Sequence, residues 1–168
     1  MSDDERHNKL FTVRKTRRLF TFDGRLVKQI DMEDRVLKDR THEYTKCSFM
    51  LDSGATDSFI SDLFISDHGI TTEDVEPHRK LDVQLADGKI YTTQKQVTRQ
   101  IHIGGYTMKW TFIVLPLQGY DTILGLDWLE FHNPHVNWTS RTVKFKYRST
   151  THTLQSNYTP FVDDADDS

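Results

Sequence analysis

The chain has 168 residues, which suits one ordinary domain and makes a two-lobed enzyme built by internal duplication a tight fit. Its composition of 36% apolar and 28% charged residues is polar for a compact domain, so we expect part of the length to lie outside the core. The formal net charge of −3 provides no overall positive field that would favour nucleic acid or an anionic membrane.

Cys47 is the sole cysteine, which excludes an intramolecular disulfide and a zinc cluster built on cysteines. Residues 1–20 show no secretory signal pattern, and no apolar run approaches the roughly 20 residues that span a bilayer. We therefore expect a cytoplasmic protein, with the nucleus as the alternative location, and no membrane partner. We also expect no cofactor and no metal.

The two ends of the chain differ from the middle. Residues 1–40 are predicted to form a charged N-terminal extension, residues 41–148 a β-rich domain, and residues 149–168 a disordered acidic tail. The extension carries a short basic cluster made of Arg14, Lys15, Arg17 and Arg18. We interpret this cluster as a solvated charge run, and weak contact with nucleic acid is the alternative.

The domain begins with apolar residues in alternation. Cys47, Phe49 and Leu51 on one face and Ser48 on the other predict a half-buried strand. A short returning strand at Phe59-Ile60 follows. Ser61 is then a suitable cap for a brief helix, and Gly69 offers the left-handed conformation that helix ends favour.

Two hairpins are predicted next. Leu81, Val83 and Leu85 alternate with polar residues up to an Asp87-Gly88 pair, whose turn needs positive φ angles. A second alternating segment reaches Gly104-Gly105 and continues through Met108, Trp110, Phe112 and Val114 on the far side of that turn.

The last part of the domain combines short strands with one helix. Residues 122–125 form a continuous apolar run, typical of a strand buried on both faces. Residues 126–131 predict a short amphipathic helix that stops at Asn133-Pro134. Strands are expected around residues 136–138 and 143–147. Many short strands with two brief helices predict a small closed or nearly closed β-barrel.

Two motifs carry a family resemblance. Asp52-Ser53-Gly54-Ala55-Thr56, placed between an apolar strand and Phe59-Ile60, resembles the active-site loop of retropepsins, the aspartic proteases of retroviruses and long-terminal-repeat retrotransposons. An Asp-Ser-Gly tripeptide alone is more often an ordinary turn, and the context decides against that. Ile123-Leu124-Gly125 resembles the second family signature. Residues 120–138 are most similar to the protease segment of gypsy-type retrotransposon polyproteins, and the resemblance spans Thr45 to Tyr147.

The resemblance implies a mainly β, retropepsin-like acid-protease barrel with a flap hairpin and one or two short helices. Hydrolysis of an amide without a metal needs a base for the water and an acid for the substrate, which two carboxylates that share one proton supply. Asp52 is the one carboxylate in such a motif, because neither Asp87 nor Asp127 follows a strand or precedes Ser/Thr-Gly. A homodimer would supply the second Asp52.

The resemblance also assigns parts to the neighbouring residues. Asp52 is the catalytic residue, and Ser53, Gly54, Ala55 and Thr56 support it, with the Gly54 N–H free to bond the carboxylate and the Ser53 hydroxyl available to the partner loop. Ala86, Asp87 and Gly88 would form the tip of a flap over a bound peptide or polyprotein, and a plain surface hairpin is the alternative. This tip is poorer in glycine than those of viral members.

Other candidates carry less weight. His132 and His135 have a spacing that metal sites use, but Pro134 lies between them and no third ligand is near, so we interpret the pair as coincidence. Trp128, Phe131 and Trp138 are expected in the core and not as a platform for bases.

Three functions remain open on the sequence. The first is an active endopeptidase that processes a retrotransposon polyprotein. The second is a catalytically silent, domesticated retropepsin fold that serves dimerisation or peptide binding. The third is a nucleic-acid-associated fragment that uses the basic cluster.

Overall fold

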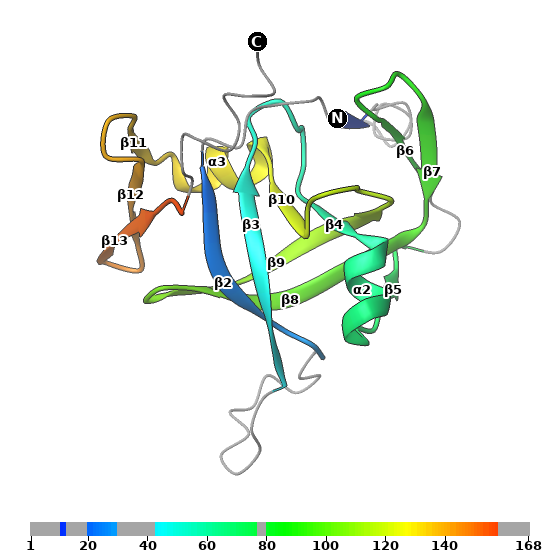
Figure 1. The fold of residues 1–168 in the computed structure, drawn as a ribbon, viewed down its shortest axis with the longest axis horizontal. Coiled ribbons are helices and arrows are strands. Elements are labelled where there is room, and N and C mark those ends of the chain that lie inside the picture. The colour runs from blue at the N-terminus through cyan, green and yellow to red at the C-terminus, as the bar shows by residue number, and fades with distance from the viewer. Residues whose placement is uncertain (1–10, 13–19, 30–42, 77–79, 158–168) are drawn as a thin grey trace.

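The computed structural model describes residues 11–12, 20–29, 43–76 and 80–157. The chain in these ranges forms β-strands with two short helices (Figure 1). The strands are β1 (Phe11–Thr12), β2 (Thr21–Val27), β3 (Tyr44–Leu51), β4 (Phe59–Ser61), β5 (Glu73–Asp74), β6 (Leu81–Gln84), β7 (Ile90–Thr93), β8 (Lys95–Ile103), β9 (Tyr106–Leu115), β10 (Thr122–Leu124), β11 (His135–Asn137), β12 (Thr142–Tyr147) and β13 (Thr150–Gln155). The helices are α2 (Asp62–His68) and α3 (Leu126–His132).

The central sheet closes into a barrel. Its strands follow the order β2-β3-β10-β4-β9-β8, and β8 pairs back onto β2 through Arg25 with His102 and Leu26 with Ile101. The pairs β3–β10 and β4–β9 are parallel, while the other ring pairs are antiparallel. Closure leaves few exposed strand edges. The mainly β barrel with short helices that the sequence predicts is therefore confirmed.

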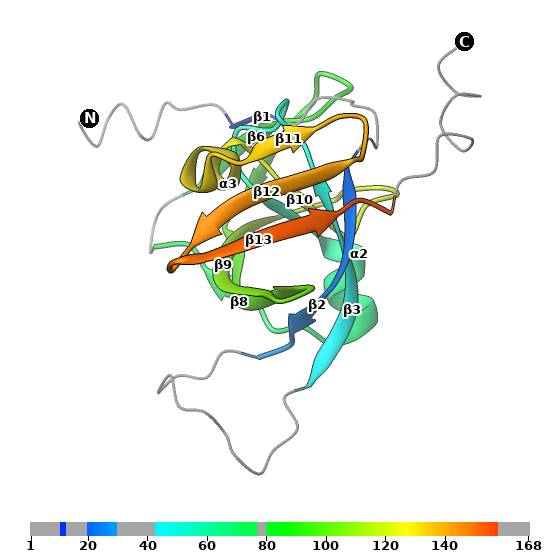
Figure 2. The same cartoon turned by 90° about the vertical axis from the view of Figure 1, so that its left-hand side faces the viewer.

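Two smaller sheets stand beside the barrel. The sheet β1-β6-β7 lies at one side, and β11-β12-β13 lies next to α3 at the other (Figures 1 and 2). The second of these sheets confirms the strands expected after the helix. Neither sheet shares a strand with the ring.

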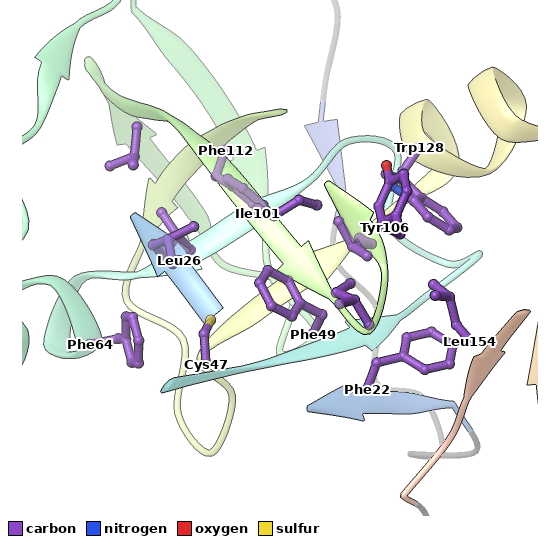
Figure 3. Packing of buried hydrophobic residues seen from close by; sticks show 14 of the residues in the cluster. Phe22, Leu26, Cys47, Phe49, Phe64, Ile101, Tyr106, Phe112, Trp128 and Leu154 are labelled. Atoms are coloured by element: carbon purple, nitrogen blue, oxygen red, sulfur yellow. The ribbon is translucent and has the colours of Figure 1, made fainter. Parts of the chain in front are cut away.

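Most of the core lies among the barrel strands. Leu26, Phe49, Ile101 and Phe112 come from four of these strands, are 0% exposed and belong to one cluster (Figure 3). Each such side chain contributes about 1.5–3 kcal/mol by leaving water. The cluster continues through Trp128 to α3 and beyond it to β13.

β3 is half-buried over most of its length, as predicted: Cys47 and Phe49 are buried on one face, while Ser48 on the other face is only half-buried. At its end the strand is buried on both faces. Phe49 belongs to the main cluster, while its neighbour Met50 is 3% exposed and belongs to a second cluster with Phe59, Val83 and Ile123. Successive side chains of a strand point to opposite faces, so the two clusters lie on either side of β3. The second cluster includes residues of β6, a strand outside the barrel.

The local signals for helices and turns are confirmed. The Ser61 hydroxyl accepts a hydrogen bond from the Phe64 N–H at the start of α2, and Gly69 ends that helix at φ 64°. Gly88 lies at φ 88° in the turn between β6 and β7, where an L side chain would be strained. Asn133 ends α3 in the left-handed region, at φ 43°.

The predicted domain boundaries are wrong at both ends. Residues 20–29, assigned to an extension, contain β2, which pairs with β3 along its whole length. Residues 150–155, assigned to a disordered tail, form β13, and its Leu154 is 3% exposed in the main core. Residues 1–10, 13–19, 30–40 and 158–168 of the two terminal segments lie outside the described residues, and with them the basic cluster of Arg14, Lys15, Arg17 and Arg18.

The tryptophan and phenylalanine residues in and near α3 differ in their exposure to solvent. Trp128 is 0% exposed, as expected, but Phe131 is 56% and Trp138 63% exposed, so the core prediction is wrong for these two. A helix of seven residues buries one face, and here Trp128 and His132 occupy it. Phe131 packs on the Trp110 ring, with centroids 5.7 Å apart.

Candidate active site

Asp52 stands directly at the end of β3. Its backbone N–H donates to the Leu124 carbonyl over 2.9 Å, and its own carbonyl accepts from the Ala55 N–H at 3.2 Å. Because β3 and β10 run parallel, the Asp-Ser-Gly loop begins where the apolar part of the second motif ends. The two motifs that carry the family resemblance are therefore neighbours in space.

The carboxyl group of Asp52 is held at one oxygen. Oδ1 accepts a hydrogen bond from the Gly54 N–H at 2.8 Å, while Oδ2 is buried and has no hydrogen-bond partner within the described residues. Asp52 is only 1% exposed. Burial raises the pKa of Asp52 above its ordinary value, and the Gly54 N–H opposes this rise. The group can thus keep a proton at a pH where an exposed aspartate has lost it.

The other loop residues surround this carboxyl unevenly. Ser53 is exposed, Gly54 and Thr56 are half-buried, and Ala55 is 0% exposed in the second core cluster. The Gly54 N–H makes the contact with the carboxylate that the sequence suggests. Ser53 is exposed, and its contact with a partner loop stays a prediction.

Gly125 permits the close approach of the two motifs. A Cβ atom there would lie 2.1 Å from the carbonyl oxygen of Asp57 and 2.8 Å from that of Ala55. Neither contact is with a flexible side chain. The next residue, Leu126, donates its N–H to the Ala55 carbonyl at 2.8 Å. A glycine is therefore required where the second motif passes behind the active-site loop.

Ser58 and Asp127 form a polar link that sequence reasoning missed. The Ser58 hydroxyl donates to Asp127 Oδ1 at 2.8 Å, and the Ser58 N–H donates to Oδ2 at 3.2 Å. Burial raises the pKa of Asp127, and the Ser58 hydroxyl opposes the rise. The available signal was an acidic residue in the first turn of a helix that starts at a glycine.

The predicted flap tip lies on the hairpin of β6 and β7. Ala86, Asp87 and Gly88 are all exposed, and Asp87 Oδ1 accepts from the Lys89 N–H at 2.9 Å, which shapes the turn. The hairpin itself is confirmed. Its role as a flap stays a prediction.

The histidine pair does not form a joint site. His132 is buried on α3, with Nε2 2.6 Å from the Tyr106 hydroxyl, whereas His135 is exposed on β11. Burial lowers the pKa of His132 to about 4. No group of three or more His, Cys, Asp and Glu residues with metal-site geometry occurs in the part of the chain that the structure describes.

The described residues also contain no helix with the length and apolar character of a membrane span.

A closed β-barrel whose Asp-Ser-Gly loop packs on an Ile-Leu-Gly segment defines a retropepsin-like protease domain. Residues 48–153 match the family model described as the PEG10/RTL1 protease domain. This match covers more than half of the chain, and the chain belongs to that family. No curated protein matches it.

The solved structures similar to the chain include the following two. One is the retroviral protease-like domain of Ddi1 from Leishmania major, with 15% identity, 84% of this chain and 98% of that chain covered, and a TM-score of 0.47. The other is Lpg0085 from Legionella pneumophila, a protein of unknown function, with 15% identity, 51% and 75% covered, and a TM-score of 0.31.

Proposed function

We propose that this chain is an aspartic endopeptidase that works as a homodimer, with one Asp52 from each subunit. The observation that carries the proposal is Asp52 Oδ2, which is buried and has no hydrogen-bond partner in the described ranges. Buried polar atoms are nearly always paired in native proteins. The buried Oδ2 atom without a partner supports a second polar group that comes from another subunit, and the exposure of Ser53 supports its contact with a partner loop.

The proposed reaction needs one proton on the pair. Two carboxylates about 3 Å apart do not both ionise, so one stays protonated. The ionised Asp52 takes a proton from water, which attacks the peptide carbonyl carbon, while the protonated Asp52 donates to the carbonyl oxygen. A proton then passes to the leaving nitrogen as the carbon–nitrogen bond breaks. The raised pKa of Asp52 in the single chain supports this sharing.

We further propose a retrotransposon polyprotein as the substrate. The similarity of residues 120–138 to gypsy-type protease segments supports this origin. The single cysteine, Cys47, is buried and unpaired, which suits a reducing compartment such as the cytoplasm. Cell fractionation with a tag on the full chain tests the location.

Substitution of Asp52 tests the catalytic role. We expect Asp52→Asn to abolish cleavage of a fluorogenic peptide, and a statine inhibitor to abolish it in the unchanged chain. The near-isosteric amide leaves packing intact, so Tm should stay close to that of the unchanged protein. Cleavage of the same bonds by the variant would refute the mechanism.

Dilution tests the dimer. Because one chain carries half of the proposed site, specific activity should fall as the protein is diluted through the dimer dissociation range. Light scattering on the same samples reports the mass. Constant specific activity from a species that scatters as a monomer would exclude a paired Asp52.

A catalytically silent peptide-binding or dimerisation module is the second candidate. The observation that favours it is the 1% exposure of Asp52, since a covered carboxyl has no access to substrate. The inhibitor and the Asp52→Asn variant separate the two candidates. A module would bind peptide equally well in both forms and cleave it in neither.

A further inference from the structure

The N-terminal strand β1 is paired with the predicted flap. Phe11 lies opposite Val83 and Thr12 opposite Gln84, in parallel register (Figure 2 shows the two strands side by side). β6 pairs with β7 along its other edge, so the sheet order is β1-β6-β7. Both edges of β6 are therefore occupied over these residues.

Phe11 is buried in an apolar cluster that also contains a residue of the Asp52 loop. Its side chain is 8% exposed and belongs to the same apolar cluster as Ala55, Val83 and Ile123. Ala55 follows Asp52 by three residues, and Ile123 lies on β10, which pairs with β3 just before Asp52. The cluster thus joins the flap strand, the Asp52 loop and the N-terminal strand.

An extended peptide commonly binds by adding a strand to a free sheet edge and placing alternate side chains in pockets. The edge of β6 that faces β1 is such an edge once β1 leaves. With β1 in place the edge is filled, and Phe11 occupies a buried position in the apolar cluster that also contains Ala55. The arrangement is that of a closed site with an occupant from the same chain.

We infer that the Phe11–Thr12 strand occupies in cis the β6 edge that an extended peptide with a large apolar side chain would use, and that such a peptide must displace it. The inference rests on the proposed function for its catalytic consequence. Its binding consequence needs no catalysis. Because only chains with β1 released can bind the peptide, the apparent Kd equals the intrinsic Kd divided by the fraction of such chains.

The binding test uses the full chain with Asp52→Asn, which cannot hydrolyse the probe. A fluorescein-labelled peptide of residues 6–17 is titrated, and anisotropy gives Kd. We expect Phe11→Asp, added to that background, to tighten binding by roughly tenfold or more, since the variant loses the burial that holds β1. The same peptide with Asp in place of its Phe should bind neither protein.

Two controls keep the result interpretable. Leu63→Asp removes an exposed apolar side chain on α2, 60% exposed, and should leave Kd unchanged. Phe11→Ala is the milder second variant if Phe11→Asp lowers Tm, and it should shift Kd in the same direction. Equal Kd values with and without Phe11 in a folded protein would overturn the inference, as would binding that ignores the Phe of the peptide.

Activity adds an independent readout. In the chain with Asp52 intact, Phe11→Asp should lower KM for an exogenous peptide roughly tenfold. The value of kcat should stay unchanged, because the chemical step after the peptide has bound is the same in both proteins. If Phe11→Asp tightens peptide binding but the chain with Asp52 intact hydrolyses no peptide, the inference that β1 occupies the β6 edge is supported and the proposed protease activity is refuted. If the chain hydrolyses the peptide but Phe11→Asp changes neither Kd nor KM, the proposed protease activity is supported and the inference that β1 occupies the β6 edge is refuted.

Discussion

The Ser58 hydroxyl donates a 2.8 Å hydrogen bond to Asp127 Oδ1 and so ties the active-site segment to the helix that follows the second motif. The Ser58 hydroxyl oxygen also accepts hydrogen bonds from the Trp110 indole N–H at 2.9 Å and from the Gly125 N–H at 3.2 Å. Ser58 is 1% exposed, so water does not reach these groups to take the place of the Ser58 hydroxyl as their hydrogen-bond partner. One hydroxyl thus joins β9, α3 and the Asp52 loop.

Ser58→Ala should destabilise the protein by about 1–3 kcal/mol, because it leaves the Trp110 and Gly125 N–H groups without their acceptor and removes one donor from the Asp127 carboxylate. Chemical denaturation gives the free energy of unfolding. Ser66→Ala is the matched control, since that exposed hydroxyl bonds only the Leu63 carbonyl of its own helix. Equal losses in the two variants would show that the Ser58 network contributes nothing special.

The pH dependence of cleavage should form a bell. Burial raises the pKa of Asp52, and a second carboxylate would raise the upper macroscopic pKa of the pair further above the reference of about 3.9. Activity is lost as the pH falls and the pair gains its second proton, and again as the pH rises and the shared proton leaves. We expect a mildly acidic optimum for kcat/KM measured from pH 3 to pH 9 with chelator present. An alkaline optimum, or inhibition by the chelator, would contradict the pair.

His132 should limit stability in acid. Burial lowers its pKa to about 4, with a smaller contribution from His152, while an unfolded histidine titrates near 6.5. Between these values the unfolded chain binds more protons, so stability is complete above about pH 6.5 and falls as the pH drops toward 4. The loss between pH 6.5 and 5 amounts to about 2 kcal/mol.

The test compares the free energy of unfolding at several pH values with that of His132→Gln, which does not titrate. The variant should lose less stability on acidification, whatever its stability at neutral pH. His135→Gln is the control, because His135 is exposed, and it should follow the unchanged protein. The raised pKa of Asp52 acts in the opposite sense but is common to all three proteins. Parallel slopes for all three would refute the role of His132.

Arg99 is a buried charge with several hydrogen-bond partners. It is 2% exposed and donates to Glu73, to the Lys28 carbonyl at 3.0 Å and to the Thr71 hydroxyl at 2.8 Å. Arg99→Met should cost about 1–3 kcal/mol, since it removes the ion-pair partner of the Glu73 carboxylate, whose side chain is 28% exposed, and the donor to the Lys28 carbonyl.

The neighbouring ion pair supplies the control. Lys95 bonds Asp74, the residue after Glu73, with side chains 53% and 70% exposed. Lys95→Met should cost at most about 1 kcal/mol, because water solvates both groups after the change. Similar costs at Arg99 and Lys95, measured by urea unfolding, would show that burial of the guanidinium does not matter here.

The sequence by itself determined the local elements and the two motifs. Alternation of apolar residues identified the long hairpin of β8 and β9, because one face of each strand has to be buried. The caps Ser61 and Gly69 fixed α2 through interactions within a few residues. Asp52-Ser53-Gly54 and Ile123-Leu124-Gly125 indicated the class of protein without any knowledge of their contact.

Tertiary structure alone decided which flanking segments belong to the barrel and what surrounds Asp52. β2 contains Asp23, Gly24 and Arg25, which interrupt any apolar period, yet it pairs with both β3 and β8. A Cβ on Gly24 would lie 2.4 Å from the His102 carbonyl oxygen, so a glycine is needed for β2 to approach β8 and close the barrel. The same glycine breaks the apolar pattern by which a strand is recognised in the sequence. The Ser58–Asp127 bond and the pairing of Phe11 with Val83 likewise join residues far apart in the chain. Such contacts leave no periodic signal, because their energy arises only when distant segments are brought together.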